Sequence, residues 1–195
     1  MPTDSSPAPD TAHASDTAHA SDTAHASDTA HASDPASHPR PPAALVLLGF
    51  VALSFLAALP GGLLTDAAWY QTLVRPAWAP PPWLFGPVWT ALYLMIALAG
   101  WLVWRAPASP GRHRALRWFF VQLALNCAWT PVFFGARATG VALVVIAALW
   151  LAILFAAGSA HRVRTTAGVL LWPYLLWVSF AAVLNAAIWW LNRNP

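Results

Sequence analysis

The chain has 195 residues, of which 58% are hydrophobic and only 9% are charged, and it contains 13 tryptophans. This composition excludes an ordinary soluble domain and predicts an integral membrane protein. The net charge of +3 is unevenly placed, because six of the seven acids precede residue 35 and nine of the ten basic residues follow residue 41. The division predicts a polar tail, residues 1–42, and a membrane domain, residues 43–193.

The tail consists largely of a six-residue repeat. Asp-Thr-Ala-His-Ala-Ser occurs four times over residues 10–33, and this segment has no apolar side chain larger than alanine. It cannot bury enough surface to offset the entropy of ordering, so we expect disorder. A repeat of six separates successive histidines by about 240° around a helix or about 20 Å along a strand, so no regular structure gathers them. We expect no built metal site there, and weak metal binding by a flexible tail is the alternative.

Charge-free intervals predict five membrane-spanning helices. The first begins near residue 43 and runs to about Pro60, and the others are expected near residues 84–104, 116–135, 138–158 and 167–191. Each run has roughly the length that a helix needs to cross about 30 Å of hydrocarbon. The runs are continuously apolar and do not alternate, which favours helices over strands. The predicted fold is an all-α bundle of five transmembrane helices.

The arginines predict the orientation of this bundle. Five spans put three arginines on the side of the carboxyl terminus and seven on the side of the amino terminus, namely Arg40, Arg105, Arg112, Arg114, Arg117, Arg162 and Arg164. Because basic residues favour the cytoplasmic side, we expect a multi-pass protein of the cell inner membrane with its amino terminus inside and its carboxyl terminus outside.

Residues 69–83, here called the lid, connect the first two spans and are rich in proline and tryptophan. Proline fixes φ and removes a backbone donor, so we expect a stiff aromatic cover over a ligand site. The candidate lid residues are Trp69, Arg75, Trp78 and Trp83.

The interiors of the predicted spans contain no Asp, Glu, Lys, Arg or His. Ion-coupled pumps need such groups within the membrane, so this function is disfavoured. A haem would find no imidazole, and Met95, Cys127 or a tyrosine would be poor axial ligands. We expect no metal centre and no obligatory cofactor, and any porphyrin or haem that did bind here as a ligand would be held by stacking and shape.

Uncharged polar and aromatic residues in the spans are the remaining candidates. Gln122 and Asn185 are equally compatible with interhelical hydrogen bonding and with ligand contact, whereas Asn126 is favoured as a ligand contact because Trp129 follows three residues later. Tryptophans at helix ends are typical of the membrane interface. Deeper positions make Trp89, Trp129 and Trp177 pocket candidates, together with the lid tryptophans.

Three motifs resemble those of the TspO/MBR family, whose animal members are the translocator proteins. They are the run from Trp69 to Trp89, the segment from Gln122 to Gly135, and the segment from Pro173 to Asn185. The resemblance covers residues 43–193 and implies a five-helix bundle with a pocket under the first loop for porphyrins and synthetic isoquinoline carboxamides. The family's ligand-contacting positions fall on Tyr70, Pro76, Trp89, Asn126, Trp129 and Trp177.

The resemblance also implies a homodimer with a face at Ala124 and Ala128, a small-xxx-small pair, and packing within one chain is the alternative. The segment from Val183 to Arg193 lacks the tyrosine of the family's sterol-binding pattern, which puts a sterol role in doubt.

We therefore expect a receptor or carrier in the lipid membrane for a flat hydrophobic ligand, a porphyrin, with a sensory, regulatory or transport role and no nucleic-acid partner. One alternative is an enzyme that degrades porphyrin with light and oxygen, with Trp89 or Trp177 as the oxidised partner, although the spans contain no acid–base pair. A passive membrane scaffold is the other.

Overall fold

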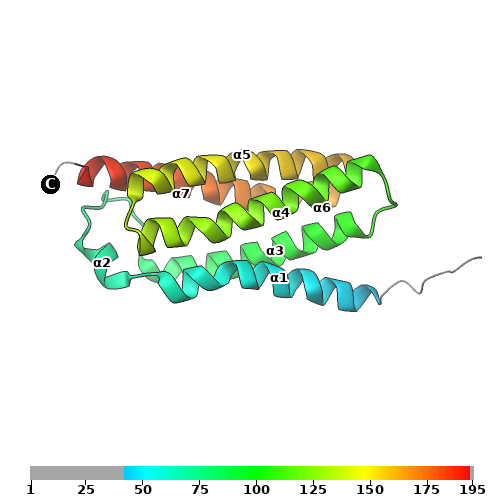
Figure 1. Ribbon diagram of the computed structural model, residues 1–195, viewed down its shortest axis with the longest axis horizontal. Helices are drawn as coiled ribbons and strands as arrows, with labels where there is room; N and C mark the ends of the chain where they lie inside the picture. The colour runs from blue at the N-terminus through cyan, green and yellow to red at the C-terminus, as the bar shows by residue number, and fades with distance from the viewer. Residues whose placement is uncertain (1–41, 194–195) are drawn as a thin grey trace, which may run out of the picture. The chain divides into compact units, whose positions relative to one another are not determined.

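The computed structural model describes residues 42–193, which form helices and connecting turns without a strand (Figure 1). Five helical segments within this range are long and apolar enough to cross a membrane, which confirms the predicted fold class. The predicted disorder of the tail concerns residues outside the described range.

The long helices are α1 (Ala43–Leu64), α3 (Phe85–Trp104), α4 (Pro110–Thr130), α5 (Thr139–Val163) and α7 (Trp172–Asn192). Shorter segments complete the chain: the helices α2 (Ala67–Thr72) and α6 (Thr165–Val169), the 3₁₀ turn η1 (Pro82–Leu84) and the π-helical turn η2 (Pro131–Gly135).

Local chemistry at the helix ends explains where the expected boundaries were wrong. Helix α4 begins at Pro110, well before residue 116, because the Ser109 hydroxyl accepts a hydrogen bond from the Arg112 N–H and proline suits a first turn. At its other end Pro131 has no N–H to continue the α-helical ladder, and the chain changes to the π turn η2. Helix α1 continues through Pro60 to Leu64.

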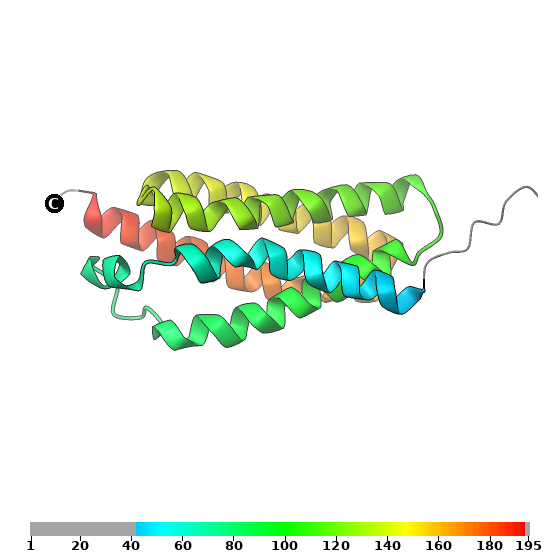
Figure 2. The same cartoon turned by 60° about the horizontal axis from the view of Figure 1, so that its bottom comes forward.

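Helices α1, α4 and α7 run in one direction, and α3 and α5 run in the other (Figures 1 and 2). The α3–α4 connection and the α5–α6 connection therefore lie at one end of the bundle, whereas the lid and the α4–α5 turn lie at the opposite end. The arginines separate accordingly, with Arg75, Arg137 and Arg193 at the lid end. Which end faces the cytoplasm stays a prediction.

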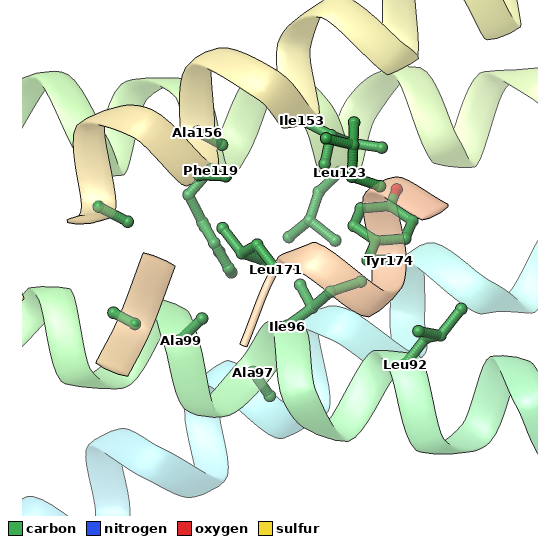
Figure 3. Close-up of a cluster of buried hydrophobic side chains, with 14 of the residues drawn as sticks. Leu92, Ile96, Ala97, Ala99, Phe119, Leu123, Ile153, Ala156, Leu171 and Tyr174 are labelled. Atoms are coloured by element: carbon green, nitrogen blue, oxygen red, sulfur yellow. The ribbon is translucent and has the colours of Figure 1, made fainter. Parts of the chain in front are cut away.

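A dense cluster of buried apolar side chains joins the long helices, and most of it lies in the half of the bundle away from the lid. Figure 3 shows part of this cluster. Ile96, Ala97, Ile153 and Tyr174 have no exposed surface. Gly100 permits the close approach of α3 to its neighbours, because a Cβ at this position would lie 2.6 Å from the ring of Phe119. Such close packing matters in lipid, where dispersion and hydrogen bonds hold helices together.

Candidate ligand cavity

A cavity of about 500 Å³ occupies the half of the bundle nearest the lid. Ligand pockets commonly enclose roughly 300–1,000 Å³, so the space suits a medium-sized organic molecule. A second void between α3, α4 and α5 measures about 10 Å³ and is lined only by apolar side chains, so it holds no ligand.

Helices α3 and α4 show how the bundle is divided between core and cavity. On α3 the cavity residues end near Tyr93 and the core continues from Ile96, whereas on α4 the core comes first and the cavity begins at Asn126. The order reverses because the two helices run antiparallel. The cavity wall thus collects residues from all five spans, as well as from α2 and η2.

Three indoles on three different helices form the flat walls. Trp89 on α3 stacks on Tyr93 with ring centroids 5.4 Å apart, and Trp129 on α4 stacks on Phe133 at 4.9 Å. Trp177 on α7 completes the set. Aromatic faces arranged in this way favour a planar, polarisable ligand.

Asn126 lies on the floor of the cavity and connects three helices. The Tyr93 hydroxyl donates to Asn126 Oδ1 at 2.6 Å, and Asn126 Nδ2 donates to the Tyr174 hydroxyl at 2.9 Å. The amide therefore holds α3, α4 and α7 together and keeps one N–H for a ligand. Asn126, which was expected to face a ligand, lines the cavity, and its contact with a ligand stays a prediction. Its two tyrosine partners were missed because nothing in the sequence places them beside it.

The two other amides have different surroundings. Asn185 accepts a hydrogen bond from Trp129 Nε1 at 3.2 Å and donates to the Thr139 carbonyl at 2.9 Å, so it bridges helices and also lines the cavity. Gln122 is buried outside the cavity lining, and neither of its amide atoms has a hydrogen-bond partner among residues 42–193.

Two buried donors on the wall also lack a partner among the described residues, namely the Tyr70 hydroxyl and Trp177 Nε1. A buried donor without an acceptor costs about 1–3 kcal/mol, so a ligand acceptor at either atom would remove a penalty. Burial raises the pKa of the Tyr70 phenol, and the nearby charge of Arg75 opposes this only in part, so the hydroxyl stays protonated at neutral pH. The Arg75 guanidinium lies 5.2 Å from the centre of the Tyr70 ring.

The start of the lid is attached to the α4–α5 turn through Asp66. This carboxylate accepts from the Trp69 N–H at 2.9 Å, capping α2, and pairs with Arg137 at 3.1 Å. The hydrogen bond from the Trp69 N–H holds the pKa of Asp66 below its usual value, and Arg137 lowers it further, although desolvation acts in the opposite direction. Arg137 adopts the left-handed conformation (φ 52°) and also lies 5.6 Å from the Trp69 ring centre.

The end of α7 holds the middle of the lid. Asn192 Nδ2 donates to the Val74 carbonyl at 2.9 Å, and the Val74 N–H donates to Asn192 Oδ1 at 3.0 Å. This pair and the Asp66–Arg137 pair fix the lid at two separate places.

The structure orients the lid side chains differently from the expectation. None of Trp69, Arg75, Trp78 and Trp83 lies on the cavity wall, and Pro76 is also outside the lining. Helix α2 directs Tyr70 toward the cavity, whereas Trp69 packs edge-on against Phe133 and Phe134 of η2. Trp78 is 49% exposed and Trp83 is 70% exposed, so they cover the bundle from outside.

Five of the six positions implied by the family resemblance therefore meet around one cavity: Tyr70, Trp89, Asn126, Trp129 and Trp177. Their contact with a ligand stays a prediction. The structure adds Phe55, Phe85, Phe133 and Phe134 to the wall. A phenylalanine within an apolar run carries no signal that would separate a wall position from a lipid-facing one.

Residues 50–191 match the model of the TspO/MBR family. The chain belongs to this family. A tryptophan-rich sensory protein of Cereibacter sphaeroides is 38% identical over 149 residues, covering 76% of this chain and 92% of that protein. Protein CrtK of Rhodobacter capsulatus is 33% identical over 144 residues (73% and 89%), and the human translocator protein is 39% identical over 128 residues (65% and 76%).

Membership of the TspO/MBR family, together with the five apolar helices, identifies a multi-pass membrane protein. The sensory and translocator proteins among its relatives support a membrane sensory or transport role.

Proposed function

We propose that this TspO/MBR protein is a membrane receptor or carrier that binds a porphyrin in the cavity under the lid, for sensing or transport. The observation that carries the proposal is a cavity of about 500 Å³ whose wall includes three indoles from three helices and two buried donors that have no partner among residues 42–193. Flat apolar faces bind a macrocycle, and the donors suit acceptor groups at its edge.

The chemistry of the wall supports binding by shape. The described lining residues include no His, Cys, Met or charged side chain, so iron in the macrocycle would gain little coordination energy from them. Arg75 lies beside Tyr70 at the edge and suits the carboxylates that natural porphyrins carry.

The closed floor favours a receptor over an open channel. Beyond the hydrogen bonds of Asn126, the core fills the bundle toward the other end. A ligand in the cavity would instead contact Tyr70 of α2, next to the residues that attach the lid. Ligand occupancy would thus bias the position of the lid, a change that a partner protein or a transport step could use.

The test is a titration of purified protein with protoporphyrin, its dimethyl ester and a linear tetrapyrrole, followed by tryptophan fluorescence. We expect saturable quenching by protoporphyrin at one ligand per chain and weaker binding of the ester, which lacks the carboxylates. An absence of saturable quenching would favour a passive scaffold. A change in porphyrin mass after illumination in oxygen, but not in darkness, would favour the enzymatic alternative.

We further propose a homodimer through α4, in the inner membrane with the amino terminus inside. Ala124 and Ala128 are exposed one helical turn apart, which supports close approach of a second copy. Ala128→Trp should convert the dimer to a monomer in mass measurements, and an unchanged mass would exclude this face.

A further inference from the structure

The end of the bundle opposite the lid carries an aromatic and basic surface on the outside of α4 and α5. The rings of Trp118 on α4 and Phe155 on α5 stack with centroids 4.9 Å apart, and Phe155 is 50% exposed. Arg114 precedes Trp118 by one turn of α4, and Arg162 follows Phe155 by two turns of α5. The four residues, here called the α4–α5 seam, lie on one face because positions four or seven apart share a helix face.

The antiparallel pairing of the two helices brings both arginines to the same end of the bundle, within about 4 Å of each other along the helix axes. A Cβ on Gly111 of α4 would lie 3.7 Å from Val163 of α5, and Trp118 of α4 contacts Phe155 of α5. Residues that come later in α4 thus lie opposite residues that come earlier in α5. Arg114 and Arg162 thus lie within one or two turns of the bundle end. Arg114 is about 6 Å beyond Trp118 along its axis, and Arg162 is about 10 Å beyond Phe155.

The charges of these two arginines are not neutralised by neighbours within residues 42–193. The one acid in that range, Asp66, lies at the lid end and pairs with Arg137. Arg105 and Arg112, at the same end as the seam, lie over the indoles of Trp101 and Trp104. Arg114 and Arg162 are exposed and form no ion pair or cation–π contact with another described residue.

The seam also has unfilled space between its arginines and its aromatic pair. Gly158, one turn after Phe155, is exposed, and a Cβ placed there would meet no atom within 4 Å. An extended chain could lie against the backbone at this point.

We propose that the α4–α5 seam binds one anionic phospholipid. The guanidinium groups of Arg114 and Arg162 bind its phosphate, the glycerol passes Gly158, and an acyl chain lies on the Trp118–Phe155 pair. The axial offsets of about 6–10 Å match the depth between a headgroup and the first methylenes, where interfacial aromatics reside. Arginine forks bind phosphate oxygens in pairs, and basic surfaces between transmembrane helices attract anionic headgroups.

This site is distinct from the proposed dimer face on the same helix. At 100° per residue, Ala124 is turned by roughly 80–120° from Arg114 and Trp118, and Ala128 by roughly 40–80°. Both alanines also lie about 9–21 Å further along the axis of α4, so a second copy on the two alanines and a lipid on the seam would occupy neighbouring surfaces.

The test is lipid titration of the full chain in neutral detergent, with retained lipids counted by native mass spectrometry. Wild-type protein should bind phosphatidylglycerol at least about tenfold more tightly than phosphatidylcholine, since each arginine near an anionic lipid contributes roughly fivefold. The double variant Arg114→Gln/Arg162→Gln should lose about 25-fold in phosphatidylglycerol affinity. The matched variant Arg117→Gln/Arg164→Gln removes the same charge at the same end and should lose less than about threefold.

A second pair of variants tests the space without changing charge. Gly158→Leu should weaken phosphatidylglycerol binding, and Gly49→Leu, at an equally open glycine on α1, should not. Circular dichroism of every variant should show unchanged helix content. Equal affinity for the two lipids, equal losses in the two double variants, or equal effects of the two glycine substitutions would overturn the proposal. A change from dimer to monomer in Arg114→Gln/Arg162→Gln would instead assign the seam to an interface between copies.

Discussion

Replacement of Trp177 by phenylalanine tests the cavity most sensitively, because it reduces an aromatic contact and removes a hydrogen-bond donor at once. The indole lies on the wall between Phe85 and Phe180, with centroid distances of 5.7 and 5.5 Å, and its buried N–H has no partner among the described residues. The aromatic face contributes about 0.5–1.5 kcal/mol to binding and a hydrogen bond to the ligand about as much again, so Trp177→Phe should lose about 1–3 kcal/mol. The dissociation constant for protoporphyrin should rise by about 5- to 150-fold.

Fluorescence titration of matched variants provides the assay. Trp89→Phe removes part of one stacked face and should weaken binding by about two- to tenfold. Trp189→Phe changes a tryptophan outside the cavity lining and should alter affinity by less than about twofold. The predicted order of losses is Trp177, then Trp89, then Trp189. Equal losses at Trp177 and Trp189 would refute the assignment of the wall.

Four further outcomes are expected. Deletion of residues 1–38 should leave porphyrin affinity unchanged, because the repeats have no side chain able to pack on a bundle, and a several-fold loss in the truncated protein would contradict this. In that truncated protein, which lacks the tail histidines, metal-free protoporphyrin should bind about as tightly as haem. Low-spin haem spectra together with a tenfold preference for haem would instead indicate an axial ligand from the protein. Met95 and Cys127 would then be the residues to mutate. Asn126→Ala leaves the hydroxyls of Tyr93 and Tyr174 without their partner, so the free energy of unfolding should fall by about 2–5 kcal/mol, whereas a loss below about 0.5 kcal/mol would show that the amide does not connect the helices. The pKa of Asp66 is lowered in the folded protein, so the Asp66–Arg137 pair that attaches the lid is complete above the ordinary pKa range of a carboxylate and is lost as the pH falls through the lowered pKa. The rate of porphyrin release from wild-type protein should therefore rise as the pH falls. In Asp66→Asn, release should be fast at every pH and should lack this pH dependence.

The five spans were predictable because an uncharged apolar run of about 20 residues is long enough to cross the membrane as a helix. Their ends were less predictable, since they depend on single interactions. The Ser109 cap starts α4 ahead of the apolar run, and Pro131 changes the end of the same helix. Helix α2 has only six residues and rests on one Asp66 cap, a signal too local to show in hydropathy.

The site was partly predictable for a related reason. Depth within a span separates Trp89, Trp129 and Trp177 from interfacial tryptophans, and all three line the cavity. The direction of the lid side chains depends on the rotation of α2, which directs Tyr70 inward and leaves Trp69 on η2. The hydrogen bonds of Asn126 join residues on three helices, and only the packed bundle brings these residues together.

If a porphyrin occupies the cavity under the lid, a side chain that fills this cavity should prevent its binding. Ala58 on α1 lines the cavity, whereas Ala52 on the same helix is exposed outside the lining. Protoporphyrin affinity should fall at least about tenfold in Ala58→Trp, because the added indole takes the volume that the macrocycle needs, and should stay within about twofold of wild type in Ala52→Trp. Equal affinity in the two variants, with helix content preserved in both, would show that the porphyrin binds outside this cavity.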